Sequence, residues 1–280
     1  MSIESLRADI VEIGRRMYAR SYTASNDGNI SVRIDASRLL MTPKSVCKGF
    51  MTPDMMCVTD LDGRKLQGDR DPSSEMLMHL EVYRQRPDVQ AVVHAHPPTA
   101  TGFAVAGIPL DRAVLAEVLT TLGSIPLAEY ATPSTAELPD AVRKYIKAHD
   151  GMLLANHGAL TVGGDLYSAY YKMETIEHFA KISLVARMLG RENLISREEV
   201  MRLQELRGTY GIKAPAPICA DPVDDVTCQT VQAPEGDGAR LIPRTFDAPG
   251  KSEKAGDDTE IRLTYRELSS LIEDAVKNLK

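Results

Sequence analysis

The sequence lacks close cysteine pairs, long apolar runs and an excess of basic residues. Its cysteines are scattered, so neither a zinc ribbon nor a disulfide scaffold is indicated; they are Cys47, Cys57, Cys219 and Cys228. The N-terminal segment has no apolar signal core, and no apolar run approaches the ~20 residues of a membrane-spanning helix. The net charge of −6, with both signs interspersed, argues against a nucleic-acid-binding surface. We expect a soluble, cytoplasmic protein that binds neither nucleic acid nor membranes.

The chain of 280 residues divides into a domain and an appendage. From Pro215 onward, prolines, glycines and aspartates recur over about 45 residues and cannot sustain a packed element. A capping box, Thr264-x-x-Glu267, then precedes an apolar stripe along one helix face. We predict a domain over residues 1–213, a Pro/Gly-rich linker over residues 214–260 and an amphipathic helix over residues 261–280. Alone in water such a helix is marginal, so it either docks on the domain or binds another protein.

Two histidines at the end of an apolar run are the most informative feature. The run Ala91–Ala95, stopped by two prolines, predicts a strand, on which His94 and His96 would share one face. His157 follows another short apolar run, directly before a glycine. Three neutral imidazoles with one open position are typical of catalytic zinc. The alternative is that these histidines are hydrogen-bonded residues of the core.

Three polar loops offer candidate anion-binding groups. The segment Ser25–Asn29 crowds turn-forming residues before a predicted strand, and is either the start of a hairpin or a backbone nest for an anion. Lys44 could meet a phosphate, or it could be a solvated loop lysine. Ser73 and Ser74 predict a helix N-cap whose hydroxyls and free amides could hold an anion.

Apolar periodicity predicts an alternation of helices and short strands. An acidic residue in a first helical turn, such as Glu75, is also explained by the helix dipole alone. His79 and His149 are expected to be structural or solvated. Helices are predicted over residues 3–17, 73–83, 99–105, 113–122, 136–149 and 165–189, and strands over residues 30–34, 39–42, 56–59, 91–95, 124–127, 152–155 and 159–162.

Four segments together carry a resemblance to a known family. They are Gly28-Asn29-Ile30-Ser31, Pro72-Ser73-Ser74-Glu75, His94-Ala95-His96-Pro97 and Asn156-His157-Gly158. In this order and spacing they resemble the class II aldolase/adducin family, most closely its fuculose-phosphate type of aldolase. The resemblance covers residues 3–212. It implies an α/β fold, a three-layer α/β/α sandwich around a mainly antiparallel central sheet, assembled as a homotetramer with active sites between subunits.

The resemblance also implies an activity and a set of site residues. His94, His96 and His157 would bind one Zn2+ per subunit, and Glu75 would be the catalytic acid/base. The reaction would cleave a ketose 1-phosphate, such as L-fuculose 1-phosphate, to dihydroxyacetone phosphate and lactaldehyde, which suits zinc acting as a Lewis acid on the enediolate. The implied phosphate-binding residues are Gly28, Asn29, Thr42, Lys44, Ser73 and Ser74.

The chain departs from the family pattern at the residue that donates a proton to the aldehyde half of the substrate. In fuculose-phosphate aldolases, a tyrosine in the segment that matches residues 113–122 donates this proton, but here the segment offers only Glu117. Tyr210 matches a second family tyrosine and could line the aldehyde pocket or pack at the chain end. Two alternatives therefore stay open: an L-ribulose-5-phosphate 4-epimerase and a non-catalytic adducin-like interaction module.

The tail is additional to the family domain. A linker followed by a short amphipathic helix resembles the encapsulation peptides that recruit enzymes into bacterial microcompartments. The resemblance implies a shell protein as partner of residues 261–280.

Overall fold

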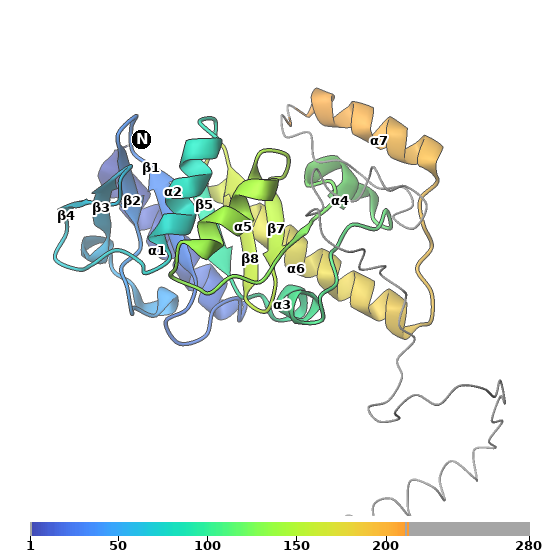
Figure 1. Cartoon of the computed structure of the whole chain (residues 1–280), viewed down its shortest axis with the longest axis horizontal. Coiled ribbons are helices and arrows are strands. Elements are labelled where there is room, and N and C mark those ends of the chain that lie inside the picture. Colours follow the sequence, from blue (N-terminus) through green and yellow to red (C-terminus); the bar gives the residue numbers. More distant parts are fainter. Residues whose placement is uncertain (1, 211, 213–280) are drawn as a thin grey trace, which may run out of the picture. The chain divides into compact units, whose positions relative to one another are not determined.

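A single sheet of eight strands organises the computed structural model, which describes residues 2–210 and 212 (Figure 1). The strand order is β4-β3-β2-β1-β5-β8-β7-β6, and every neighbouring pair is antiparallel except β6 and β7. The strands are β1 (Asn29–Arg33), β2 (Arg38–Met41), β3 (Cys57–Asp60), β4 (Lys65–Gln67), β5 (Ala91–Ala95), β6 (Leu127–Ala128), β7 (Gly151–Leu154) and β8 (Gly158–Gly163). The predicted mainly antiparallel sheet is confirmed.

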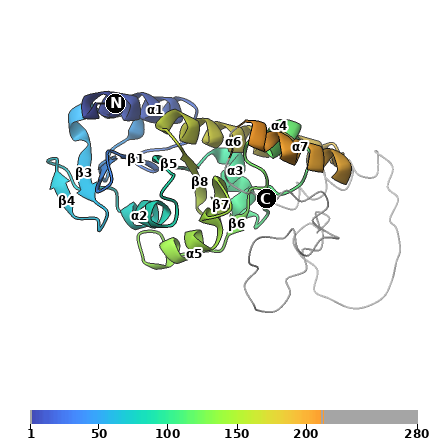
Figure 2. The same cartoon turned by 90° about the horizontal axis from the view of Figure 1, so that it is seen from above.

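Helices cover both faces of this sheet (Figure 2). On one face lie α1 (Ile3–Ala19), α3 (Pro98–Val105) and α6 (Leu166–Met188), and on the other lie α2 (Met76–Gln85) and α5 (Glu137–Ile146). Strand residues alternate between the two resulting cores: Val93 packs with the first set of helices and Val92 with the second. The three-layer α/β/α sandwich is therefore confirmed.

Two further helices pack against each other. They are α4 (Ala116–Thr121) and α7 (Arg197–Thr209), which share a small apolar cluster that contains Leu119 and Val200. Two short 3-10 helices, Lys48–Phe50 and Pro53–Met55, connect β2 to β3. Among the described helices, none is long and apolar enough to cross a membrane.

Most predicted elements occur, with shifted ends. The strand predicted over residues 91–95 is β5, whereas the helix predicted over residues 113–122 shortens to the six residues of α4, and the strand predicted over residues 124–127 shortens to the two of β6. Helix α7 was not predicted. The linker, the C-terminal helix and the boundary at residue 213 lie outside the described residues and stay predictions.

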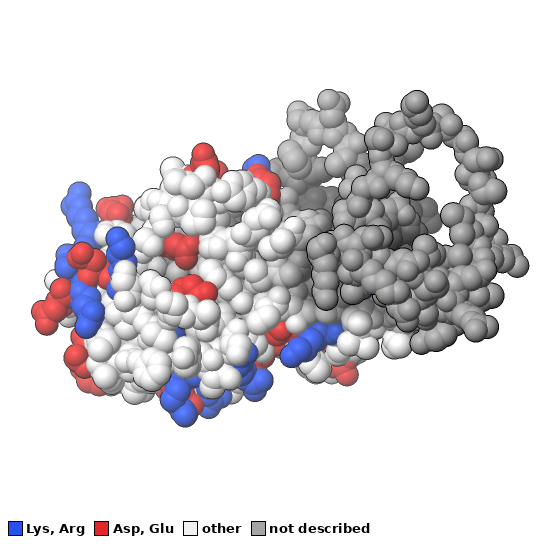
Figure 3. All heavy atoms as spheres, turned by 90° about the horizontal axis from the view of Figure 1, so that it is seen from below, with Lys and Arg blue, Asp and Glu red and all other residues white. Residues whose placement is uncertain are grey.

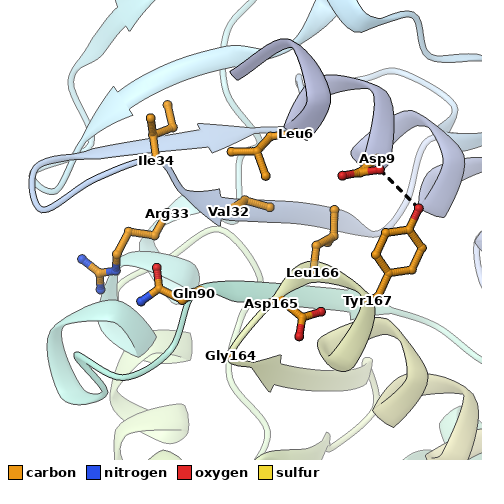
Figure 4. Close-up of a pocket in the computed structure, with 10 residues that line it drawn as sticks. All are labelled: Leu6, Asp9, Val32, Arg33, Ile34, Gln90, Gly164, Asp165, Leu166 and Tyr167. Carbon is orange, nitrogen blue, oxygen red and sulfur yellow. Dashed lines mark hydrogen bonds between the residues drawn. The ribbon is translucent and has the colours of Figure 1, made fainter. Parts of the chain in front are cut away.

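The strand register gives the central sheet two distinct ends. Asn29 pairs with His94 at one end, and Val32 pairs with Ala91 towards the other. At the second end lies a cavity of about 250 Å3 where Tyr167 donates a hydrogen bond to Asp9 (3.2 Å, Figure 4). Its lining is Leu6, Asp9, Val32, Arg33, Ile34, Gln90, Gly164, Asp165, Leu166 and Tyr167. The three candidate histidines and Glu75 gather at the opposite end, the end of Asn29 and His94.

Candidate metal centre

Three imidazoles converge at the Asn29–His94 end of the sheet. His94 lies within β5, His96 lies just after it, and His157 lies in the turn between β7 and β8. One ring nitrogen from each lies within 4.8 Å of the other two. The ring centroids are 4.7–5.1 Å apart. The structure thus brings together the three histidines that the sequence singled out.

Hydrogen bonds outside the cluster fix the tautomers of two rings. His94 Nδ1 lies 2.9 Å from the carbonyl oxygen of Ala159, and His96 Nδ1 lies 2.9 Å from an Asp27 carboxylate oxygen. Because these oxygens only accept, each Nδ1 carries the proton. The two Nε2 atoms, 3.1 Å apart, therefore face each other with bare lone pairs when the rings are neutral. A cation between them removes that repulsion, and carboxylate- or carbonyl-anchored histidines are the usual arrangement around a bound metal.

The turn that carries His157 depends on two special backbone positions. Asn156 has a φ of 56°, in the left-handed region that asparagine tolerates better than most residues. At Gly158, an added Cβ would lie 2.5 Å from both the Ala95 carbonyl oxygen and the His96 ring. The close approach of β8 to the end of β5 therefore requires glycine here, and it is what brings His157 to the other two rings.

Glu75, at the start of α2, faces the imidazoles. Its Oε2 lies 3.3 Å from His94 Nε2 and its Oε1 lies 3.0 Å from His157 Nε2. The prediction that a serine caps this helix was wrong: Glu75 itself occupies the N-cap position of α2, while Ser73 Oγ accepts a hydrogen bond from the Glu75 amide (3.3 Å). The first helical residue is therefore Met76, and the Glu75 carboxylate lies beside His94 and His157.

The electrostatics favour neutral histidines beside an ionised carboxylate. Burial lowers the pKa of His94 and of His96, although the Glu75 and Asp27 carboxylates respectively oppose the shift. Burial raises the pKa of Glu75, but the His94 and His157 rings and the Asn29 amide outweigh it and hold that pKa below its ordinary value. Neutral imidazoles are the form that binds metals.

The donor set fits a divalent metal. Three imidazole nitrogens with an adjacent carboxylate match the ligand chemistry of a zinc centre that keeps a position for substrate. The ligands His94, His96 and His157 would hold the ion, and Glu75 would stand next to it.

The implied phosphate-binding segments also meet beside Glu75. The Lys44 amide donates to the Asp71 carbonyl (2.9 Å), and the Ser73 amide donates to the Thr42 carbonyl (3.2 Å). Lys44 and Ser74 are exposed. The Thr42 hydroxyl is buried and accepts a hydrogen bond from the Ile30 amide (3.1 Å). Phosphate binding by these segments stays a prediction.

Besides Asp27, which contacts His96, the Ser25–Asn29 loop places Gly28 and Asn29 beside the centre. Gly28 has a φ of 70°, and an added Cβ would meet Thr23 at 2.6 Å and the His94 carbonyl oxygen at 3.0 Å. The next side chain, Asn29, donates from its amide to Glu75 Oε2 (2.7 Å). In this structure Asn29 thus orients the catalytic candidate, and its implied role towards phosphate stays a prediction.

The two candidate aldehyde-side residues are not in the cluster. Tyr210 ends α7 and is 66% exposed, and Glu117 is exposed on α4. Their predicted roles remain untested.

Sequence reasoning missed the partners that orient the ligands. Asp27 was counted only as a turn former, although it anchors His96. Lys48, which is buried, donates to the carbonyl oxygens of Asn26 (2.9 Å) and Val46 (2.7 Å) and holds the same loop in place. The proximity of Asp27 to His96 in the fold leaves no signal in the sequence order.

Comparison with known proteins places the chain in a family. The model of the class II aldolase and adducin N-terminal domain matches residues 8–184. An L-fuculose phosphate aldolase from Methanococcus maripaludis is 32% identical over 63% of this chain and 95% of its own length. A 3-oxo-tetronate 4-phosphate decarboxylase from Pectobacterium atrosepticum is 31% identical over 66% of this chain and 86% of its own length. A solved L-fuculose 1-phosphate aldolase superposes with a TM-score of 0.67 at 30% identity, covering 72% of this chain and 95% of that one. The chain therefore belongs to the class II aldolase and adducin N-terminal domain family.

Proposed function

We propose that the chain is a zinc-dependent aldolase that cleaves a ketose 1-phosphate, of the L-fuculose 1-phosphate kind, to dihydroxyacetone phosphate and lactaldehyde. The observation that carries the proposal is the contact of Glu75 with two members of the histidine cluster, at 3.0 and 3.3 Å. The similarity to fuculose phosphate aldolases supports the substrate class. A cation held by the three imidazoles would supply Lewis-acid stabilisation of negative charge on the substrate oxygens.

The remaining chemistry falls to the chain's own residues. Cleavage passes the proton of the C4 hydroxyl to water, breaks the C3–C4 bond, releases the aldehyde and leaves the electron pair on C3. Glu75, after taking up a proton, would act as the acid that delivers it to C3 and so completes dihydroxyacetone phosphate. The cluster brings this carboxyl within reach of a substrate held against the imidazoles, while Asn29 orients it (2.7 Å). Lys44 and the Ser73–Ser74 segment, adjacent to Glu75, would hold the phosphate end.

A decarboxylase is the second candidate function. Loss of CO2 from a 3-oxo acid also leaves an electron pair on the carbon next to a carbonyl, so the same cation and the same Glu75 would serve it. It releases no aldehyde and needs no proton-transfer group on that side. The observation that favours it is the absence of tyrosine from residues 113–122, together with the similarity to oxo-tetronate phosphate decarboxylases.

One experiment separates these reactions. Zinc-loaded protein is incubated with fuculose, rhamnulose and ribulose phosphates and with 3-oxo-tetronate 4-phosphate, and triose phosphate, CO2 and epimers are followed together. Aldolase activity gives triose phosphate with aldehyde, and it disappears in Glu75→Gln and on chelation. CO2 release moves the assignment to the decarboxylase, and an epimer without free triose moves it to the 4-epimerase. If the zinc-loaded protein forms none of these products, the proposed function is wrong.

A further inference from the structure

A chain of buried hydrogen bonds runs from the interior of α2 to Glu75. The Tyr83 hydroxyl lies 2.9 Å from Ser31 Oγ, which lies 2.6 Å from His79 Nδ1. His79 Nε2 lies 2.5 Å from Asn29 Oδ1, and Asn29 Nδ2 lies 2.7 Å from Glu75 Oε2. His79 and Ser31 are fully buried, and Tyr83 and Asn29 are 3% exposed. The chain alternates between α2 and β1, so it ties the helix that carries Glu75 to the central sheet.

The ionised Glu75 carboxylate fixes which group donates and which accepts in each of these hydrogen bonds. An ionised carboxylate only accepts, so Asn29 must donate with its amide nitrogen and present its oxygen to His79. His79 Nε2 must then carry the proton, which leaves Nδ1 to accept from the Ser31 hydroxyl. Ser31 in turn accepts from Tyr83. Every group has one role, and no alternative arrangement satisfies all of them while Glu75 is charged.

His79 is the member that makes the chain rigid. A buried histidine with one donating and one accepting nitrogen can hold the Asn29 amide in a single orientation. Burial lowers the pKa of His79 to about 4, so the ring stays neutral near pH 7 and keeps these two different nitrogens. Without it, the Asn29 amide could turn and present its oxygen to Glu75, where two acceptors would repel each other.

We propose that His79 is a positioning residue, which with Ser31 holds the Asn29 amide so that it donates to Glu75. This inference rests on the proposed role of Glu75 in proton transfer. The amide fixes one carboxylate oxygen and leaves the other to exchange a proton with the substrate carbon. His79 touches neither the metal ligands nor the substrate carbon, so its effect should appear in the proton transfer and not in metal binding.

The test compares two substitutions of His79 with a matched control. Gln can still donate to Asn29 from the same position, whereas His79→Leu removes both hydrogen bonds. His149 serves as the control, since it is also buried and bonded through one nitrogen, to the Ser124 carbonyl (3.1 Å), but it lies outside the chain. Three quantities are measured on zinc-loaded protein: exchange of the C3 proton of dihydroxyacetone phosphate with deuterium oxide, zinc affinity, and unfolding temperature.

We expect His79→Leu to slow deuterium exchange about 10- to 100-fold, the range for residues that orient a metal-site group, with zinc affinity unchanged within about threefold. His79→Gln should restore most of the exchange, and His149→Gln should exchange at the wild-type rate. Normal exchange in His79→Leu, a parallel loss of zinc affinity, or no rescue by Gln would overturn the proposal.

A second measurement tests the proposed role of His79 without depending on the reaction. Nitrogen-15 NMR of the zinc-loaded wild type should show His79 protonated at Nε2, and the Asn29 side-chain amide signal should shift in both His79→Leu and Glu75→Gln. A proton on Nδ1 would contradict the inference. A wild type that exchanges no substrate proton but has the Nε2 tautomer and both amide shifts would contradict only the proposed function.

Discussion

At the scale of single residues, Gly158 decides how closely the metal ligands approach one another. A Cβ at this position would lie 2.5 Å from the His96 ring and from the Ala95 carbonyl oxygen. We therefore expect Gly158→Ala to displace His96 and to weaken zinc binding about 10- to 100-fold, as a disturbed ligand orientation does. Competition with a chelator of known affinity measures this. Gly164→Ala is the control, because nothing lies within 4 Å of its added Cβ, and equal losses in both variants would refute the argument.

His149 gives stability a dependence on pH. Burial lowers the pKa of His149 to about 4, despite its bond to the Ser124 carbonyl. Between this value and the 6.5 of an unfolded histidine, the unfolded chain binds the extra proton, so stability falls as pH falls through this window. We expect metal-free wild type to lose about 2 kcal/mol more unfolding free energy between pH 7 and pH 5 than His149→Gln does. Urea unfolding at the two pH values measures this, and parallel losses would show that His149 is not responsible.

The residue identities of the centre could be predicted, but their orientation could not. His94 and His96 are two positions apart at the end of an apolar run, and that local pattern is enough to suggest a metal pair. The position of Glu75 at the N-cap depends on how α2 packs against the sheet. The roles of Asp27 and His79 depend on contacts between segments that are distant in sequence, for which a single sequence carries no signal.

At the scale of elements, a carboxylate from another helix caps the N-terminus of α3. Glu177 of α6 accepts hydrogen bonds from the amides of Thr99 (3.0 Å) and Ala100 (2.9 Å), in the first turn of α3. Glu177 is 4% exposed, so its removal leaves buried amides without acceptors. We expect Glu177→Ala to lower the unfolding free energy by about 2–3 kcal/mol and, because His96 lies two residues before this helix, to weaken zinc binding.

A neighbouring position on the same helix provides the control. Glu174 of α6 forms a more exposed ion pair with Arg20 (2.9 Å), and such pairs contribute at most about 1 kcal/mol. Urea unfolding of Glu174→Ala should therefore differ little from wild type. If both variants lose the same free energy, the contacts at the start of α3 do not explain the effect of Glu177.

Elements with strong periodicity were the predictable ones. The stripe of Leu6, Ile10, Ile13 and Met17 is buried as one face of α1, and β5 matches its predicted range. Helix α7 was missed because few of its side chains are buried, Val200 and Arg207 among them. Strand β6 is short because only Leu127 and Ala128 pair with β7, and such pairing depends on the partner strand.

At the scale of the whole molecule, one face of the described residues carries its charge unevenly. On the face in Figure 3, lysine and arginine side chains gather towards one end and one rim, with acidic side chains among them. Over the residues that are described there, acidic side chains stand in the otherwise uncharged middle of this face. Tyr210 and Glu117 are exposed, which would leave them free to meet a neighbouring subunit in the homotetramer that the family resemblance implies.

The segment beyond the family domain should be separable from catalysis. All the residues that form the metal centre and its hydrogen-bond partners lie between Asp27 and Ala159. We therefore expect deletion of Gly250–Lys280 to leave substrate cleavage and the mass measured by light scattering, about four chains corrected for the deletion, unchanged. If the amphipathic stripe after Glu267 binds a microcompartment shell protein, the same deletion abolishes co-sedimentation with shells. A linker deletion that keeps residues 261–280 is the matched control and should still co-sediment. Lost cleavage with unchanged co-sedimentation would instead assign the tail to the enzyme's own assembly.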